Sequence, residues 1–232
     1  MLKPKNWGLE IGTCKPLLLR CEQVDLGLKR TILYASDLHL RPSNQARIEE
    51  EIYEILESQR PDFFLLGGDL ADNPNSLSTL ARIVEAATTS SQVGAVAGNH
   101  DHLVGRARIK QTVLDSGGSW LPDQAIHSSD LSILGHPEQA RLGKRSVLCS
   151  HYPTAFTPAR AQGIDLVLAG HLHGWQIVLW QRGEYLYPGA FLSRWNGTRF
   201  NRDEATLLVS RGMTDLCPIR WNCPREVILV EI

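Results

Sequence analysis

The sequence predicts an α/β fold, in which the strands of a sheet alternate with helices that cover it. Five short, mostly apolar runs have the composition of strands buried on both faces of a sheet. Amphipathic segments with helical spacing separate the first of these runs, and Gly and Pro mark the joints between elements. The five runs span residues 31–36, 63–66, 93–97, 146–149 and 164–169.

Three helices are expected on the outside of this sheet. Residues 43–59 place four Ile and Leu side chains on one face, opposite a charged face, and Pro61 follows. Residues 76–89 repeat the apolar spacing, and residues 106–114 form a third candidate. Beyond the third helix the pattern favours short strands separated by Gly, Pro, Asp or Asn. These strands are expected at Ile126 and at residues 131–134, 176–180, 185–187, 205–210 and 227–232.

Length and composition favour a single globular domain over residues 1–232. The chain is 43% hydrophobic, which at this length is enough to bury a sizeable core. Its formal net charge of −1 provides no electrostatic signature of a nucleic-acid-binding protein. The apolar run Leu17-Leu18-Leu19 is far shorter than a membrane span or the apolar core of a signal peptide. A cytoplasmic protein is therefore expected.

The cysteines lack the paired spacing of a structural zinc site, and their number is odd. Reduced thiols are the simpler interpretation. Cys149 is expected in a buried strand, whereas Cys217 and Cys223 flank a Pro-containing turn and are expected to be more exposed. The cysteines occupy positions 14, 21, 149, 217 and 223.

A polar motif follows each of the five apolar runs. Because ligands of open α/β sheets bind outside the carboxyl ends of the strands, residues far apart in sequence are expected to converge there. In Asp37-x-His39 the two side chains are one residue apart, so both can point the same way from an extended segment. The motifs are Asp37-Leu38-His39, Gly68-Asp69-Leu70-Ala71-Asp72, Gly98-Asn99-His100-Asp101, Ser150-His151 and Gly170-His171-Leu172-His173.

The ligand types in these motifs indicate a metal centre. Carboxylate, amide oxygen and imidazole together suit divalent or trivalent Mn, Fe, Zn or Co, whereas Mg or Ca prefers an all-oxygen set. The motifs contain more potential ligands than one ion needs. Glycines beside them fit tight turns where the backbone passes close to a metal or a phosphate.

The motifs resemble those of the calcineurin-like metallophosphoesterases, which read D-x-H, GD-x-x-D, GNH(D/E), H and GH-x-H. The resemblance spans residues 32–173 with order and spacing intact. It implies a metallophosphoesterase-type β-sandwich with βαβ units and flanking helices, and two bound metals bridged by Asp69. One metal would be held by Asp37, His39, Asp69 and His173. The second would be held by Asp69, Asn99, His151 and His171.

The same resemblance implies how the site works. His100 matches a catalytic histidine that is not a ligand, which stabilises the transferring phosphoryl group or protonates the leaving oxygen. Asp72 matches the acid that orients this histidine. Two close metals would lower the pKa of a bridging water and provide hydroxide at neutral pH. The expected reaction is hydrolysis of a phosphodiester or pyrophosphate; a phosphomonoesterase, including a protein phosphatase, and a non-catalytic scaffold of the same fold are the alternatives.

Residues 210–213 and 218–227 resemble the tail of a bacterial branch of predicted phosphohydrolases. Some relatives in that branch cleave the pyrophosphate of a lipid-linked nucleotide, so a lipid-linked small-molecule substrate and peripheral membrane contact stay open. Arg211 and Arg220 fall in this tail and either clamp a phosphate or form solvated ion pairs. Arg41 could also reach the substrate.

An aromatic region follows the last motif, and it has two interpretations. It forms either an apolar entrance for an acyl chain or membrane surface, or ordinary packing within the sandwich. An exposed segment at residues 189–193 would favour the first interpretation. His102 is likewise either a pocket residue or an exposed one. The apolar residues concerned are Trp175, Trp180, Phe191, Leu192 and Trp195.

Overall fold

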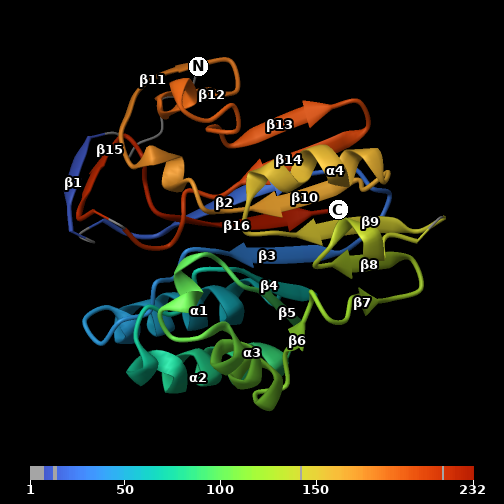
Figure 1. The fold of residues 1–232 in the computed structure, drawn as a ribbon, viewed down its shortest axis with the longest axis horizontal. Coiled ribbons are helices and arrows are strands. Elements are labelled where there is room, and N and C mark those ends of the chain that lie inside the picture. Colours follow the sequence, from blue (N-terminus) through green and yellow to red (C-terminus); the bar gives the residue numbers. More distant parts are fainter. Residues whose placement is uncertain (1–7, 13–14, 142, 216) are drawn as a thin grey trace.

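The computed structural model describes residues 8–12, 15–141, 143–215 and 217–232. In this part of the chain, two six-stranded sheets pack face to face (Figure 1). The first sheet has the order β2 (Leu18–Gln23), β16 (Glu226–Glu231), β3 (Thr31–Ala35), β4 (Phe63–Gly67), β5 (Gln92–Val96) and β6 (Ser119–Trp120). The second has the order β13 (Arg199–Arg202), β14 (Ala205–Val209), β10 (Leu166–Ala169), β9 (Arg145–Cys149), β8 (Leu131–Leu134) and β7 (Ile126–His127).

Helices cover the outer face of each sheet. The three predicted helices are confirmed as α1 (Gln45–Gln59), α2 (Leu77–Thr88) and α3 (Arg106–Asp115), which alternate with the parallel strands β3, β4, β5 and β6 in successive βαβ units. They lie together below the first sheet in Figure 1. The second sheet carries α4 (Phe156–Ala161), which the sequence analysis missed because it is only six residues long and contains a proline.

Side-chain alternation along the strands builds three apolar layers. In β3, Ile32 and Tyr34 point into the core between the sheets, whereas Leu33 and Ala35 point toward the helices. In β10, Leu166 and Leu168 face the same inter-sheet core, and the alternate residues pack toward α4. Both sheets are therefore buried on two faces, which explains the continuous apolar runs. The predicted β-sandwich with βαβ units and flanking helices is confirmed.

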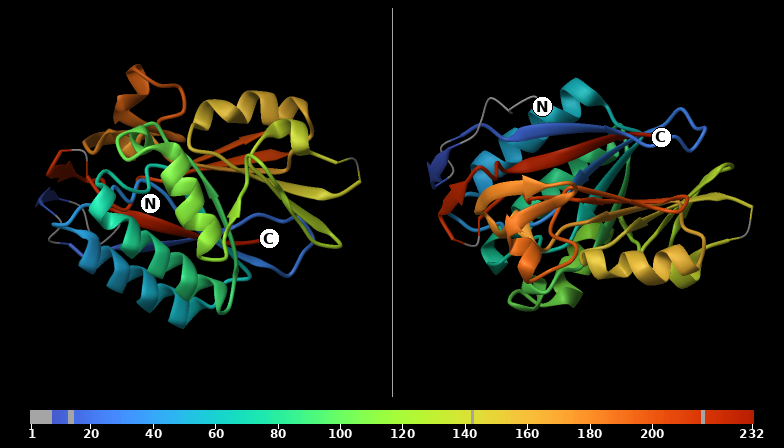
Figure 2. Two further views of the ribbon diagram at one scale, coloured as in Figure 1. Left: turned by 60° about the horizontal axis from the view of Figure 1, so that its bottom comes forward. Right: turned by 90° about the horizontal axis from the view of Figure 1, so that it is seen from above.

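Two short ribbons extend from one end of the sandwich. One pairs β1 (Leu9–Ile11) with β15 (Ile219–Trp221), and the other pairs β11 (Val178–Arg182) with β12 (Tyr185–Pro188). A β-bridge between Ile177 and Trp221 joins the two ribbons. Both lie at the same end of the molecule in Figures 1 and 2. Short 3₁₀ helices occupy Pro74–Ser76, His100–His102, Pro137–Gln139, Pro153–Ala155, His173–Trp175 and Gly189–Phe191.

Several elements differ from the sequence-based expectation. The run at residues 17–19 belongs largely to β2, an edge strand that no alternating pattern had marked. None of the helices in the described residues is long and apolar enough to cross a membrane. Cys21, Cys149, Cys217 and Cys223 are free thiols, whereas Cys14 lies outside the described residues. The expectation for Cys223 is wrong, because its side chain is buried against the turn at residues 173–174.

Candidate metal centre

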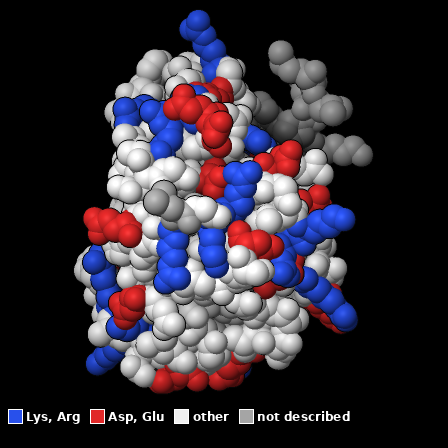
Figure 3. All heavy atoms as spheres, turned by 90° about the vertical axis from the view of Figure 1, so that its right-hand side faces the viewer, with Lys and Arg blue, Asp and Glu red and all other residues white. Residues whose placement is uncertain are grey.

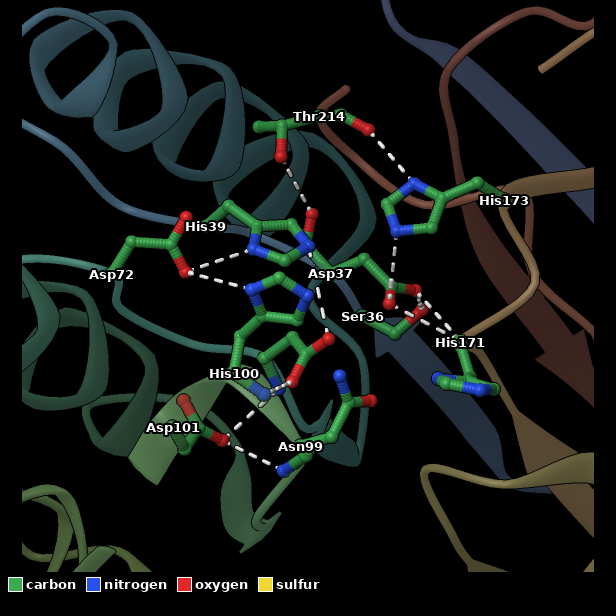
Figure 4. A network of polar contacts seen from close by, with 12 residues as sticks. Ser36, Asp37, His39, Asp72, Asn99, His100, Asp101, His171, His173 and Thr214 are labelled. Carbon is green, nitrogen blue, oxygen red and sulfur yellow. Dashed lines mark hydrogen bonds and ion pairs between the residues drawn. The ribbon is translucent and has the colours of Figure 1, made fainter. Parts of the chain in front are cut away.

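The polar motifs converge at the carboxyl ends of five strands, three from the first sheet and two from the second. The loops after β3, β4 and β5 provide one half of the site, and the loops after β9 and β10 provide the other half. Figure 4 shows Asp37, His39 and His173 facing one another, with Asn99 nearby. All the ligand candidates of the sequence analysis are therefore brought to one edge of the sandwich: Asp37, His39, Asp69, Asn99, His151, His171 and His173.

The backbone at the site adopts conformations that non-glycine residues rarely take. Five of the ligand candidates have φ between 42° and 72°, in the left-handed region, where each such residue costs on the order of 1 kcal/mol or more. Asp37 and His39 therefore do not converge from an extended segment, as was expected, but from a left-handed turn. Such strain persists where the surrounding structure requires it. The five residues are Asp37, His39, Asp69, His171 and His173.

One group of potential ligands comprises Asp37, His39 and His173, whose ligand atoms all lie within 4.8 Å of one another. The Nδ1 atom of His39 hydrogen-bonds the Asp72 carboxylate at 2.9 Å, and that of His173 donates to the Thr214 carbonyl at 3.1 Å. Both Nε2 atoms point inward and are buried, and neither has a hydrogen-bond partner among the described residues. The Nε2 atom of His173 lies 3.4 Å from Asp37 Oδ1, so a cation between them would relieve the repulsion of the two lone pairs.

The second group comprises Asp69, His151 and His171. The Nδ1 atom of His151 donates to the Gly67 carbonyl at 2.9 Å, which directs Nε2 inward. That Nε2 atom lies 3.0 Å from the Asn99 side-chain oxygen, 3.2 Å from His171 Nδ1 and 3.3 Å from Asp69 Oδ2. Three further nitrogen and oxygen donors thus lie within 3.3 Å of His151 Nε2. They match the ligand types of a first-row transition metal.

Asp69 connects the two groups. Its Oδ2 atom lies 3.3 Å from His151 Nε2 and 3.8 Å from His39 Nε2. Its Oδ1 atom accepts a hydrogen bond of 2.6 Å from the backbone of His100, which fixes the orientation of the carboxylate. Both donor sets therefore meet at one carboxylate, and the residues present fit a pair of ions.

Electrostatics at the site favour bound cations. Burial would raise the pKa of Asp69, but the hydrogen bond and charge of His151 outweigh it and lower that pKa to about 2. Burial lowers the pKa of His173 to about 4, so its ring is neutral at neutral pH. Burial also disfavours protonation of His39, yet the carboxylates around it, Asp72 foremost, raise its pKa. The site therefore combines ionised carboxylates with a neutral His173 ring, and the carboxylates favour positive charge beside them.

His100 and Asp72 lie beside the first group. The Asp72 carboxylate is 4.0 Å from His100 Nδ1 but hydrogen-bonds His39, and its other oxygen accepts from Arg41 at 2.8 and 2.6 Å. Asp72 thus contacts His39 more closely than the histidine it was expected to orient. His100 packs edge-on against His39, and its side chain is 33% exposed. Exposed His102 contacts the Asn99 carbonyl instead.

Three residues that the sequence analysis gave no role contribute to the site. The buried carboxylate of Asp101 accepts hydrogen bonds from the backbone nitrogens of Gly98, Asp69 and Leu70 at 2.7 to 3.0 Å, so it ties two motif loops together. Tyr152 packs edge-on against both His151 and His171. Thr214 supports His173 through its carbonyl. The position of Asp101 directly after the ligand motif was the available signal, whereas a backbone carbonyl leaves none in the sequence.

Close backbone approach explains two of the motif glycines. A Cβ atom on Gly98 would lie 2.1 Å from the Asp69 carboxylate, and one on Gly170 would lie 2.5 Å from the Asp37 carboxylate. Any larger residue would displace a ligand candidate. The interpretation of these glycines as points of tight approach is therefore consistent with the structure.

Arg211 and Arg220 support the site from behind rather than forming solvated pairs. Arg211 pairs with the buried Glu226, and Arg220 pairs with Asp215. Arg220 is 1% exposed and also donates to the Thr214 carbonyl at 2.7 Å, the same carbonyl that holds His173. The guanidinium groups are thus committed to the protein itself.

A cavity and an apolar surface border the site. The cavity has a volume of about 620 Å³, opens beside His151 and has Trp120 and Tyr152 in its walls, with Arg106 and Lys110 among its lining residues. Within residues 189–193, Phe191 and Leu192 are exposed whereas Gly189 is buried, and Trp175 and Trp180 are exposed as well. Trp195 instead packs in the outer core of the second sheet.

The chain is similar to several known proteins. Residues 30–175 match the family model described as Calcineurin-like phosphoesterase. An uncharacterized metallophosphoesterase of Aquifex aeolicus is 26% identical, covering 92% of this chain and 89% of the relative. Phosphodiesterase YaeI of Escherichia coli is 25% identical, covering 87% of this chain and 81% of the relative. The solved structure of TT1561 of Thermus thermophilus aligns with a TM-score of 0.49 at 10% identity, covering 78% and 89% of the two chains.

The family match covers well over half of the chain and includes every strand-end motif of the site. The candidate metal ligands in the structure are the motif residues themselves. The chain therefore belongs to the calcineurin-like phosphoesterase family, whose members are metal-dependent hydrolases that act on phosphoester bonds.

Proposed function

We propose that this protein is a two-metal phosphohydrolase that cleaves a phosphodiester or a pyrophosphate bond. One observation carries the proposal. The Nε2 atoms of His39 and His173 are buried and lack hydrogen-bond partners among the described residues. The Nδ1 atoms of the same rings are held by Asp72 and by the Thr214 carbonyl. Leaving such atoms unsatisfied costs roughly 1–3 kcal/mol each. Metal coordination would remove this cost.

The two donor groups support an assignment of the ligand residues to two metal ions. When bound, the ions would polarise phosphate oxygens and lower the pKa of a bound water. Mn, Fe, Zn and Co all suit the mixed nitrogen and oxygen donors. Asp69 would serve both ions. One ion would be held by Asp37, His39, Asp69 and His173, and the other by Asp69, Asn99, His151 and His171.

His100 is the proposed catalytic residue that is not a ligand. Its backbone nitrogen holds Asp69, and its partly exposed ring lies beside the first donor group, where a substrate oxygen can reach it. It would donate a proton to the leaving oxygen. Asp72 would act mainly through His39, which it orients, with Arg41 neutralising its second oxygen.

The cavity beside His151 supports a diester or a pyrophosphate over a monoester. Its volume of about 620 Å³ can hold an organic group bonded to the phosphate, and its walls include apolar surface. Arg106 adds positive charge to the lining, which suits a second anionic group, whereas Lys110 is paired with Asp123. The name of the Escherichia coli relative, a phosphodiesterase, points the same way. A monoesterase is the alternative that the assay must distinguish.

The proposal is tested with chelator-stripped protein to which Mn²⁺ is restored, using bis(p-nitrophenyl) phosphate and p-nitrophenyl phosphate in parallel. Asp69→Asn should lower the metal-dependent rate roughly a thousandfold, because metal polarisation contributes several kcal/mol. His100→Ala should lower it by about two to four orders of magnitude. His127→Ala, at an exposed position in β7, should leave the rate nearly unchanged.

Faster hydrolysis of the monoester than of the diester would replace the diesterase assignment with a monoesterase. Stoichiometric metal binding without hydrolysis of either compound, or of a pyrophosphate such as a nucleotide sugar, would favour the scaffold.

A further inference from the structure

Large apolar side chains are concentrated at the end of the molecule formed by the two ribbons, here called the apolar end. Phe191 is 71% exposed and Leu192 is 73% exposed, although both are of types that usually lie inside a protein. Contiguous exposed apolar surface of this kind marks a contact site. The apolar end comprises Leu9, Ile11, Trp175, Ile177, Leu179, Trp180, Phe191, Leu192, Ile219 and Trp221, all of them exposed.

The β1–β15 ribbon inverts the usual alternation of a half-buried strand. Leu9 pairs with Trp221 on its outward face, and Ile11 pairs with Ile219 there. The residue between them in β1, Glu10, is buried, as is Arg220 in β15. A ribbon facing water would normally turn its charged residues outward. The outward face is therefore suited to an apolar environment.

Aromatic packing holds the exposed side chains of the second ribbon in place. The rings of Trp180 and Tyr187 are stacked at 5.1 Å with an interplanar angle of 3°, and Phe191 packs against Tyr187 at 5.0 Å. Trp and Tyr are also the residues enriched where proteins meet the lipid headgroup region. The surface is thus organised before it meets a partner.

The charged residues near the apolar end indicate which kind of surface it binds. Within residues 8–12, 175–195 and 217–222, the exposed charged residues are Arg182 and Arg194. Glu184 is partly buried and paired with Arg202. The opposite end of the molecule instead carries Lys and Arg interspersed with Asp and Glu (Figure 3). Apolar and aromatic residues flanked by arginines match a membrane with anionic headgroups, to which each cationic side chain adds attraction.

The apolar end begins at the metal centre. Trp175 follows the ligand candidate His173 by two residues, in the same 3₁₀ helix. It also packs against the turn of Phe191, because a Cβ atom on Gly189 would lie 2.4 Å from the Trp175 ring. A molecule held at this surface therefore lies close to the site.

We propose that the apolar end docks on a membrane surface that contains anionic lipid, with Phe191 and Leu192 inserted below the headgroups and the tryptophans at their level. Docking depends only on this surface. A consequence, which rests on the proposed function, is that the substrate is an amphiphilic phosphoester or pyrophosphate presented by the membrane.

Docking is measured by co-sedimentation of the full chain with phosphatidylcholine vesicles, with and without phosphatidylglycerol. The wild type should bind the anionic vesicles. Phe191→Ser/Leu192→Ser should weaken binding at least about tenfold, since burial of each large side chain accounts for roughly one order of magnitude in partitioning. Arg182→Gln/Arg194→Gln should reduce the preference for anionic vesicles about fivefold or more. Leu114→Ser, a 41% exposed position on α3, is the matched control and should bind like the wild type.

Absence of binding by the wild type, or equal binding by the Phe191/Leu192 variant, overturns the proposal. Size measurement in solution provides a further check, because a dimer that this variant dissociates would assign the surface to a second copy of the chain. Hydrolysis of the water-soluble diester should be the same in the variant and the wild type. Loss of vesicle binding with that rate intact thus separates docking from the proposed function.

Discussion

The metal centre and the apolar end depart from the usual distribution of polar and apolar groups in opposite ways. At the metal centre, polar atoms such as Nε2 of His39 and His173 are buried without hydrogen-bond partners among the described residues. At the apolar end, side chains such as Phe191 and Leu192 are exposed. Either arrangement is unfavourable in water alone. Each therefore indicates what the region is suited to bind, a cation in the first case and an apolar phase in the second.

The two regions differ in how far their function can be read from the sequence. The metal centre depends on which residues follow each strand, and that is visible in a short stretch of sequence. The apolar end depends on which face of a ribbon is turned outward, and only the paired strands reveal this. Three predictions test how far the two regions are independent.

The largest effect is expected at Arg220, which lies in β15 of the apolar end but supports the metal centre. Arg220→Met removes the partner of Asp215 and a donor to the Thr214 carbonyl, leaving buried polar groups unpaired. The free energy of unfolding should fall by about 3–5 kcal/mol. Urea denaturation measures it. Arg182→Met, at an exposed position in β11, is the control; equal stability of the two variants would contradict a structural link between the regions.

A smaller effect, on metal affinity, should show whether Asp72 acts mainly on His39 or on His100. Asp72→Asn weakens the support of His39, and loss of such a supporting partner typically lowers metal affinity by about 10–100-fold. Titration calorimetry with Mn²⁺ measures the change. Asp203→Asn, at an exposed position near α4, is the control. Unchanged affinity with a shifted pH dependence of hydrolysis would show that Asp72 acts on His100 instead.

The smallest effect is expected at the apolar end itself. Leu192→Ser should change the free energy of unfolding by less than about 0.5 kcal/mol, because the side chain is already in water. Leu208→Ala, inside the core between the sheets, should cost roughly 2–5 kcal/mol. Denaturant unfolding of the metal-free proteins measures both changes. A large loss at Leu192 would mean that the segment serves folding rather than contact.

The sequence could predict the central strands of both sheets, the three long helices and the convergence of the ligand motifs, because each leaves a local pattern, whereas the edge strands β2 and β6 were missed. The short helix α4 and the edge strand β13 escaped, since six residues around Pro158 and the polar run of β13 resemble loops. The role of Asp101 could not be predicted, because its hydrogen-bond partners are backbone nitrogens. The left-handed backbone conformation of Asp37 could not be predicted, because residue type does not determine φ at a non-glycine position.

The placement of Arg220 between Ile219 and Trp221 has a consequence for how this protein can change. Successive residues of a strand face opposite sides, so removing one residue from β15 would exchange the two faces. The guanidinium would leave the carbonyl that holds His173, and apolar side chains would turn inward, in one event. A one-residue deletion in β15 would thus disturb the exposed apolar face and the support of His173 at the same time.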